Sequence, residues 1–504
     1  MSETADTVNT APSGQTRSIT TPLAGTTGTS TDRALAADLR RRYGFLREIV
    51  AEMERSVPYA AALVGGVDGV RLSLRDGEQQ ASRRDPQHGI VLTASNGAFL
   101  EEVATDATDP HSVQRVAREL VERVRAAQAV QAAAGSRPPA LRLDPGEPLD
   151  ADFATPVTVD PLQQSLAEKL SRYEALRQKV RGLDRRVVQA VTHYADGVES
   201  KVFVNRTRFV TDIVRRVSLY LALFVSDGQQ RRYDWLHLGG TGGLERITVG
   251  DHDLERMRDT AVALLSARPV PGGTYDVVAD PSVAGVLAHE AFGHGVETDM
   301  FLKDRARGAA YIGHTVGSPH VTIMDDPTVP GGNGTYAIDD EGQLAQPTCI
   351  IKEGVLQRGL SDLYSASRLG ITRSANGRRE SFARKAYARM SNTFFAPGTH
   401  TPEQLLESLD YGLLLQQASS GMEDPKGWGI QVSTHYAREY RGGKPTGVLY
   451  APISLTGYVP DVLHQVSMVA NDLELHAGGC GKGWKEYVPV GDGGPHVRTR
   501  VRLG

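Results

Sequence analysis

The chain has 504 residues, of which 40% are hydrophobic and 23% charged, and its formal net charge is −4. This balance is ordinary for a globular protein and offers no basic surface for nucleic acid or an anionic membrane. No apolar run approaches the ~18 residues of a membrane-spanning helix. With two cysteines and no apolar leader, the sequence indicates a reduced, cytoplasmic protein that binds neither nucleic acid nor membranes.

The first part of the chain predicts a tail followed by a small folded module. Residues 1–32 are rich in Thr, Ser and Gly, which is typical of a disordered segment. Apolar residues then recur every three or four positions over 35–53 and again over 113–124, and this spacing predicts two helices. Between them, the alternation in "VRLSLRDG" (70–77) predicts a strand. We therefore expect an N-terminal α+β module over 33–131.

A second module is expected after a linker. Residues 132–156 are rich in Pro and Gly and lack periodicity, so they predict the linker. Apolar spacing predicts helices over 162–176 and 254–264. The stretch from 199 to 228 alternates apolar and polar residues between short polar breaks, which favours antiparallel strands. These elements define a middle α+β module over 157–268.

The remaining residues, 269–504, are strand-rich and contain many glycine-bearing turns. Helices and strands do not alternate regularly along the chain, so a parallel βαβ fold is not indicated. The sequence therefore predicts an α+β protein in which smaller N-terminal α/β modules precede a strand-rich C-terminal domain.

One short segment of that domain, "DPSVAGVLAHEAFGHG", carries the clearest chemistry. Asp280 followed by Pro281 is a strong helix start, because Asp caps the first turn and Pro fits its first position. His289 and Glu290 follow in the same helix, and His294 lies five residues beyond His289. The common zinc-protease motif separates its two histidines by four residues. A spacing of five places them about 140° apart around a regular helix, too far to share one ion.

Two local geometries would bring these histidines together. A π-type turn returns residues five apart to nearly the same helix face. Alternatively, the helix ends at Gly293, and His294 turns back from the exit. Either geometry lets His289 and His294 share a metal while Glu290 stays beside it.

A catalytic zinc site needs a third protein ligand and an open position. The segment "LELHAGGCGKGW" offers His476 and Cys480 in what we expect to be a glycine-rich turn. Glu297 and Asp299 also follow the motif closely, and they could either bind the ion or orient the imidazoles. Chemistry favours the Cys480 thiolate, because zinc binds sulfur well. The other cysteine, in the apolar strand "TCIIKEGVL", fits a small buried side chain better.

The chain resembles the TldD/PmbA family of metallopeptidases, specifically its metal-bearing TldD-type subunit. The matching segments are "HEAFGHGVETD", "TIMDDPTVPGGNGTYAIDDEG", "GVLQRGLSDLYSASRLG", "SANGRRESF", "ARMSNTFFAPGTHTPEQLL", "HAGGCGKG" and "VGDGGPHVR". They cover essentially all of 270–500 in order, whereas 57–265 resembles the family's N-terminal modules more loosely. The family usually reads CGKxGQ where this chain reads "CGKGWKEY".

The resemblance implies that 269–504 is a metallopeptidase domain holding one catalytic Zn²⁺. By the same resemblance, His289, His294 and Cys480 are the metal ligands and Glu290 is the general base. A metal-free TldE-type partner subunit is implied as well, closing a chamber over the site. From their residue types, the pair Arg378 and Arg379, together with Arg389 and Asn392, are candidates for positioning substrate or stabilising an oxyanion.

The expected activity is zinc-dependent hydrolysis of amide bonds in small or unfolded peptides, with this chain as the catalytic subunit of a heterodimer. Three alternatives stay open at this point. The altered "CGKGWKEY" segment leaves room for an amide hydrolase that matures a peptide-derived natural product. The chain could instead be a non-catalytic partner subunit, although such partners lack the ligands. A purely structural zinc site would need a fourth protein ligand.

Overall fold

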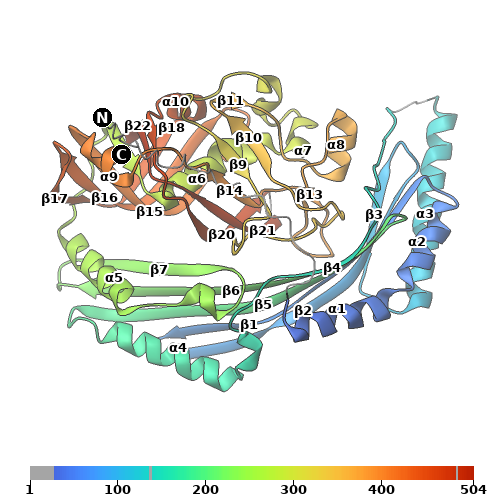
Figure 1. The fold of residues 1–504 in the computed structure, drawn as a ribbon, viewed down its shortest axis with the longest axis horizontal. Coiled ribbons are helices and arrows are strands. Elements are labelled where there is room, and N and C mark those ends of the chain that lie inside the picture. Colours follow the sequence, from blue (N-terminus) through green and yellow to red (C-terminus); the bar gives the residue numbers. More distant parts are fainter. Residues whose placement is uncertain (1–27, 136–138, 484–485) are drawn as a thin grey trace, which may run out of the picture.

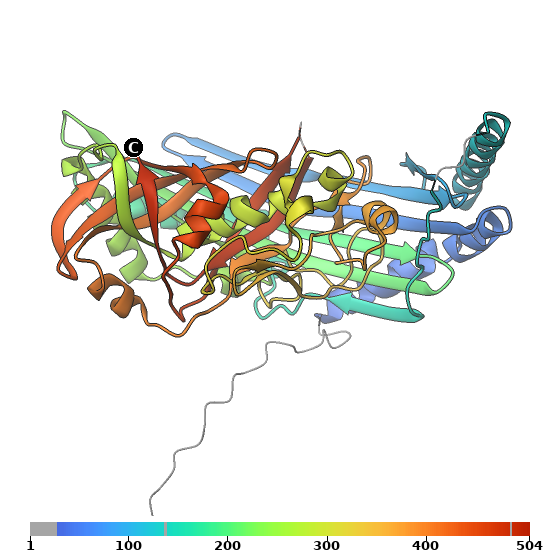
Figure 2. The ribbon, with the colours of Figure 1, turned by 90° about the horizontal axis from the view of Figure 1, so that it is seen from above.

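The computed structural model describes residues 28–135, 139–483 and 486–504. Figure 1 shows a long N-terminal sheet with helices beneath it and a C-terminal region above it. Turned by 90°, the C-terminal region lies across one part of this sheet, and α2 and α3 stand at the other end (Figure 2). The α+β class expected from the sequence is confirmed.

The N-terminal sheet has seven strands, and most of its pairings are antiparallel. Strands from both expected N-terminal modules belong to it, because β1 pairs with β5 from Ala62↔Val204 to Leu74↔Thr192. Only β4 is parallel to its neighbour, the start of β6. The spatial order is β3 (Leu100–Thr105), β2 (Glu78–Ser95), β1 (Tyr59–Arg75), β5 (Val187–Val204), β6 (Arg208–Ser226) and β4 (Leu149–Ala154), with β7 (Arg231–Thr241) also paired to β6.

Both faces of this sheet are buried, each against a different layer. On β1, Ala60 and Ala62 face a core shared with the helices, whereas Ala61 and Leu63 face a cluster that includes Ile338 of the C-terminal region. Successive residues of a strand point to opposite faces, so one strand serves both layers. The covering helices are α1 (Ser30–Tyr43), α2 (Leu46–Glu54), α3 (Pro110–Ala133), α4 (Leu166–Arg181) and α5 (Asp251–Ala263).

The start of the ordered chain differs from the sequence-based boundary. Residues 1–27 lie outside the described residues, but 28–32 are not a disordered tail. Thr29 and Asp32 form a capping box at the start of α1. Asp32 is fully buried and accepts a hydrogen bond from Arg215 Nε at 2.7 Å. The Thr/Ser-rich composition of residues 1–32 predicted disorder up to Asp32. Composition could not show that a capping box and an ion pair with Arg215 hold the last residues of this segment.

The expected linker 132–156 also contains structure, since β4 forms within it and pairs with β6. Likewise, the apolar pattern over 35–53 forms two helices rather than one. α1 and α2 are separated at Gly44 and Phe45. The spacing of apolar residues continues from 35 to 53 without interruption, so it could not show that the helix breaks between Tyr43 and Leu46.

The C-terminal region contains two larger sheets with helix α6 (Pro281–Phe292) packed between them. The first has the order β11 (Val355–Leu356), β10 (Thr348–Lys352), β9 (Ile323–Asp325), β14 (Asn392–Phe395), β21 (Glu486–Gly494) and β20 (Glu474–Lys482). The second has the order β15 (Tyr411–Asp424), β8 (Gly273–Ala279), β22 (Val497–Leu503), β18 (Ile453–Tyr458), β16 (Gly429–Arg441) and β17 (Lys444–Tyr450), with β19 (Met468–Val469) beside β22.

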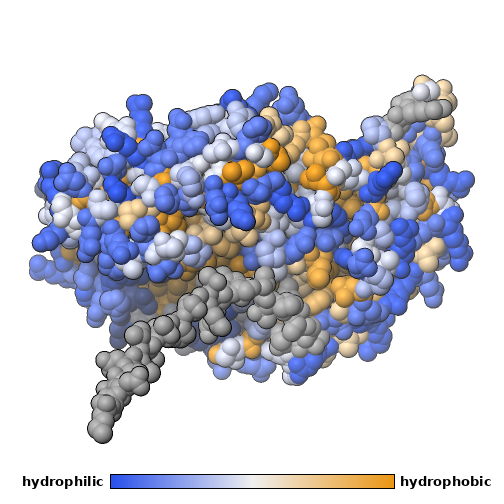
Figure 3. Space-filling model, turned by 45° about the horizontal axis from the view of Figure 1, so that its top comes forward, coloured by the Kyte–Doolittle hydropathy of each residue, from blue (hydrophilic) through white to orange (hydrophobic). Residues whose placement is uncertain are grey.

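Short elements complete this region. They are the hairpin of β12 (Gly377–Arg378) and β13 (Tyr387–Ala388) and the helices α7 (Thr298–Phe301), α8 (Leu363–Leu369), α9 (Pro402–Glu407) and α10 (Val459–His464). The molecular face in Figure 3 is mainly hydrophilic, with separate apolar patches. Within the described ranges, no helix combines the length and apolarity required to span a bilayer.

Candidate metal centre

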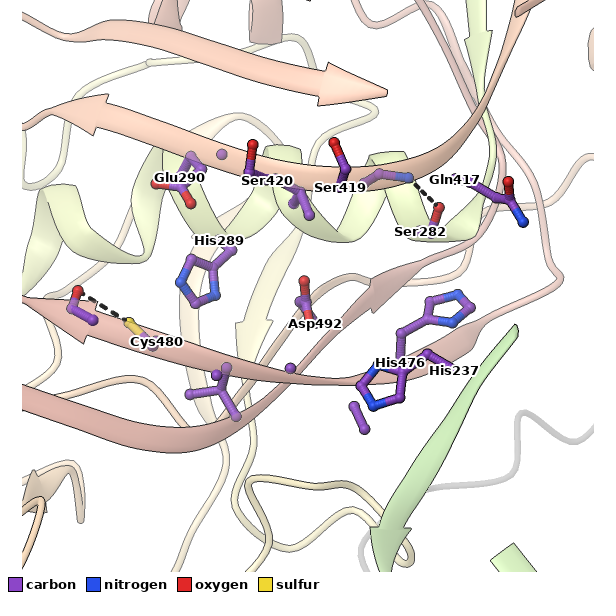
Figure 4. Close-up of a pocket in the computed structure, with 18 of the residues that line it drawn as sticks. His237, Ser282, His289, Glu290, Gln417, Ser419, Ser420, His476, Cys480 and Asp492 are labelled. Carbon is purple, nitrogen blue, oxygen red and sulfur yellow. Dashed lines mark hydrogen bonds between the residues drawn. The ribbon is translucent and has the colours of Figure 1, made fainter. Parts of the chain in front are cut away.

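Helix α6 begins as its sequence predicts. The Asp280 side chain accepts a hydrogen bond from the Val283 backbone N–H at 2.9 Å, and Pro281 occupies the first turn. The helix is buried along nearly its whole length because it contacts β15 on one side and β20 and β21 on the other. Figure 4 shows α6 between these strands, with the candidate site at its C-terminal end.

The spacing of the two histidines is resolved by the end of the helix. α6 ends at Phe292, and His294 begins a short 3₁₀ turn, η4 (His294–Val296). Gly293 lies between the helix and this turn. Only a glycine fits there, because a Cβ would lie 2.0 Å from the Met390 sulfur. Of the two geometries considered, the structure therefore has the helix end rather than the π-type turn.

Cys480 comes from β20, about 190 residues further along the chain. The glycine-rich segment around it forms an edge strand paired with β21, not the turn expected from its composition. Its thiol sulfur lies 3.1 Å from His294 Nε2, and the rings of His289 and His294 have centroids 5.2 Å apart. One ligand atom from each of the three residues falls within 4.8 Å of the others.

The charges of this cluster are strongly coupled. Burial raises the pKa of the Cys480 thiol, but the neighbouring His294 and His289 outweigh it, and the net pKa lies well below the ordinary value. For both imidazoles, burial lowers the pKa, whereas the negative charge of Cys480 raises it above the usual value. Two nitrogens and a thiolate are thus held together, which is a favourable donor set for zinc.

Glu297 supports the cluster from behind rather than joining it. His294 Nδ1 lies 3.1 Å from Glu297 Oε2, so the carboxylate orients this imidazole. Lys482 Nζ lies 3.0 Å from the same oxygen and 2.6 Å from Asp299. Burial raises the pKa of Glu297, but Lys482 and His294 together lower it to about 2. Glu297 therefore matches the orienting role considered from the sequence, whereas Asp299 contacts Lys482 rather than an imidazole.

Arg389 also contacts this arrangement. Its Nη2 donates a hydrogen bond to the Cys480 carbonyl at 2.8 Å, and its Nε lies 3.5 Å from Glu297. The side chain is buried, and it does not line the cavity described below. Arg389 is therefore placed to fix the strand that carries the thiol.

Glu290 lies beside the cluster and opens onto the cavity. β15 passes so close to it that a Cβ at Gly421 would lie 2.4 Å from Glu290 Cγ, which explains a glycine there. Burial raises the pKa of Glu290 above its ordinary value, although His289 and His294 lower it. A carboxyl group beside the cluster and open to the cleft is placed to exchange a proton with a molecule bound there.

These groups share one cleft of about 1240 Å³ between the N-terminal sheet and the C-terminal region. Its lining includes His289, Glu290, His294 and Cys480, the four residues that the resemblance singled out. The described lining residues also include members that sequence reasoning had not assigned. These are Tyr220, Tyr233, Trp235 and His237 from the N-terminal sheet, and Gln417, Glu423 and Asp492 from the C-terminal region.

The other proposed substrate-binding residues do not reach this cleft. Arg378 Nη1 donates to the Met390 carbonyl at 2.6 Å, and Arg379 Nη1 donates to Glu102 at 3.1 Å. Asn392 donates to a backbone carbonyl at the end of β9. All three side chains lie in buried networks that join loops and strands, and none is among the residues that line the cleft. Arginine and asparagine satisfy such interior carbonyls well, so residue type alone could not separate this use from substrate binding.

The residues present fit a metal ion. His289 Nδ1 is buried and has no hydrogen-bond partner, which is costly for a polar atom unless a ligand occupies the site. The described residues contain one cluster of three such ligands, and His476 is not part of it. His476 lies further along the cleft beside His237, as Figure 4 shows.

The sequence of the chain is similar to those of named metalloproteases. Residues 272–502 match the PmbA/TldA metallopeptidase C-terminal domain. A protein named as a metalloprotease in Methanothermobacter thermautotrophicus is 36% identical over 62% of this chain and 69% of its own length. A metalloprotease TldD homolog from Haemophilus influenzae is 32% identical over 68% of this chain and 72% of its own length. The chain belongs to the TldD/PmbA metallopeptidase family.

More distant members of the TldD/PmbA family extend the comparison. A Saccharolobus solfataricus protein named as a zinc metalloprotease TldD homolog is 27% identical over 49% of this chain and 55% of its own length. A crystal structure of a proposed DNA gyrase modulator from Thermotoga maritima covers 92% of this chain and 99% of its own at 17% identity, with a TM-score of 0.73. TldE from Thermococcus kodakarensis covers 91% of this chain and 100% of its own at 16% identity, with a TM-score of 0.67. At these identities the two structures show the shared fold.

Proposed function

We propose that this chain is the catalytic subunit of a zinc-dependent peptidase that hydrolyses amide bonds in small or unfolded peptides. The observation that carries the proposal is the convergence of His289, His294 and Cys480 beside Glu290 at the wall of a large cleft. The naming of one relative as a zinc metalloprotease supports the choice of metal.

His289, His294 and Cys480 would hold one zinc ion and leave one position facing the cleft. A bound zinc ion supplies Lewis-acid chemistry, polarising a carbonyl and lowering the pKa of water. A structural zinc site is closed by four protein ligands, whereas the cluster found among the described residues has three. The donor count therefore favours catalysis over a purely structural role.

Glu290 would act as the general base. It would accept a proton from the attacking water and return it to the nitrogen of the leaving amine as the amide bond breaks. Glu297, held by Lys482, would keep His294 in one orientation while this occurs.

The cleft shape supports a peptide substrate. Its walls come from separate regions of the chain, and its volume of about 1240 Å³ exceeds what a single amino acid fills. We further propose a TldE-like, metal-free partner, because the chain shares its fold with TldE over nearly the full length of that protein. The partner would cover the cleft and restrict entry to flexible chains.

The test is hydrolysis of a pool of unstructured peptides, followed by mass spectrometry, with and without a co-expressed TldE-like subunit. We expect cleavage by the zinc-loaded protein, its loss after chelation, and its return with one equivalent of zinc. Cleavage that persists in metal-free protein would overturn the proposal. If light scattering shows that the fully active protein is a monomer, the proposed partner is not required for activity.

A further inference from the structure

Two strands line the cleft from the metal centre to its far end. On β15, Gly421 contacts Glu290, and Gln417 lies four residues earlier. On β20, Cys480 belongs to the metal cluster, and His476 lies four residues earlier on the same side of the strand. Figure 4 shows Gln417 and His476 together at the end of α6 opposite Glu290 and Cys480.

The far end meets the N-terminal sheet at β7. Gln417 Nε2 donates to the Trp235 carbonyl at 3.2 Å, and a Cβ at Gly239 would lie 3.2 Å from Ala477. His237 lies beside His476. A wall of the cleft therefore comes from a sheet outside the metal-bearing region.

This wall consists of aromatic rings in contact with one another. Tyr233 and Trp235 project from the same side of β7, with ring centroids 5.6 Å apart. Tyr233 stacks on Phe224 of β6 at 5.3 Å, and Trp235 packs against His435 of β16 at 4.4 Å. Tyr233 nevertheless stays 38% exposed, and both Tyr233 and Trp235 line the cleft. We call the pair Tyr233 and Trp235 the aromatic wall.

The strands set a minimum for the distance between the wall and the metal centre, because the wall lies beside or beyond Gln417 and His476. Four residues of extended chain span about 13 Å. A peptide lying along the cleft in an extended conformation advances by the same distance per residue. A side chain at least four positions from the scissile bond would therefore be needed to reach the aromatic wall.

We propose that the aromatic wall is a distal specificity site, which takes an aromatic side chain at least four residues from the scissile bond. This proposal rests on the peptidase function proposed above and names the substrate class of the same cleft. Rings packed on rings at 4.5–7 Å gain stabilisation beyond simple burial. The wall is already built from such pairs, and Tyr233 stays 38% exposed where it lines the cleft.

The experiment uses a quenched fluorescent peptide with one fixed cleavage site and alanine at the flanking positions. Phenylalanine, leucine or lysine is moved one position at a time from two to six residues away, on either side. We expect kcat/KM to peak with phenylalanine at one position, the fourth or a more distant one on one side, at about two- to tenfold over alanine. A profile without a preferred position, or a peak with lysine instead, would overturn the site.

Two variants assign the effect to the wall. Trp235→Ala and Tyr233→Ala should abolish the phenylalanine preference while keeping zinc content and hydrolysis of the all-alanine peptide. Tyr411→Ala is the matched control, because Tyr411 is also 38% exposed but lies outside the described lining of the cleft. An unchanged preference in both wall variants would contradict the assignment.

A binding measurement separates this inference from the proposed function. The zinc-loaded Glu290→Gln protein is titrated with the same peptides, and binding is followed by fluorescence anisotropy. If no peptide is hydrolysed by the wild type but affinity still peaks with phenylalanine at one position, the peptidase function fails and the site stands. If peptides are cleaved but neither rate nor affinity depends on the aromatic residue, the site fails and the function stands.

Discussion

The N-terminal sheet and the metal centre differ in how their buried polar groups are paired. Under the sheet, Lys169 Nζ lies 2.5 Å from Asp196, and the buried Arg215 pairs with the fully buried Asp32. In the metal centre, His289 Nδ1 has no hydrogen-bond partner, and neither buried oxygen of Glu423 has one. A protein that needs only stability pairs its buried ions, because an unpaired one is costly. In the metal centre, the unpaired His289 Nδ1 belongs to one of the three residues that could hold a metal ion.

The strongest test of this contrast removes the sulfur. Cys480→Ser should lose both zinc and detectable hydrolysis, because the thiolate is the strongest donor of the three. His476→Ala is the control and should keep its zinc, since His476 lies outside the cluster. Metal analysis gives the stoichiometry, and X-ray absorption of the wild type should show one sulfur at about 2.3 Å. A first shell without sulfur would show that another residue completes the site.

A second change separates chemistry from metal binding. Glu290→Gln should lower kcat by about 10²- to 10⁴-fold while the zinc content stays constant, because the side chain moves protons and does not hold the ion. Steady-state kinetics on protein of measured zinc content checks this. Loss of zinc from the folded variant would make Glu290 a ligand, and unchanged turnover would remove it from the mechanism.

The N-terminal sheet offers the complementary test. Arg215→Met leaves the Asp32 carboxylate buried without its partner, which should lower the free energy of unfolding by about 3–5 kcal/mol. Zinc bound per folded molecule should not change. Urea denaturation measures the change in the free energy of unfolding. Arg41→Met is the matched control, because the Arg41–Asp38 pair is exposed and should have little effect. An equal decrease in the free energy of unfolding for Arg215→Met and Arg41→Met would show that the buried ion pair matters no more than the exposed one.

The smallest expected effect concerns the group that orients His294. Glu297→Gln removes the charge behind this imidazole and should weaken zinc binding by about 10- to 100-fold without changing the number of ligands. Competition with a chromophoric chelator measures the affinity. Glu474→Gln, which alters an exposed carboxylate elsewhere in the cleft lining, provides the comparison. Identical affinities for both variants would mean that Lys482 and Arg389 suffice to hold the site.

The sequence by itself determined the local parts of this protein. The Asp280–Pro281 helix start and the helices later seen as α3, α4 and α5 follow from capping and from apolar spacing. The resemblance supplied the family and the four residues His289, Glu290, His294 and Cys480. These features depend on neighbouring residues or on quoted motifs, so they can be read along the chain.

Only the tertiary structure decided what depends on distant pairing. His294 and Cys480 meet across 186 residues because β20 pairs with β21, and β21 in turn contacts α6. The merging of two expected modules into one sheet depends on the β1–β5 pairing. The aromatic wall reaches the cleft because β7 lies against β20. Strand pairing joins residues that lie far apart in the sequence, so local patterns do not reveal it. For the same reason, residue type alone did not distinguish the buried Arg378, Arg379 and Asn392 from residues that face a substrate.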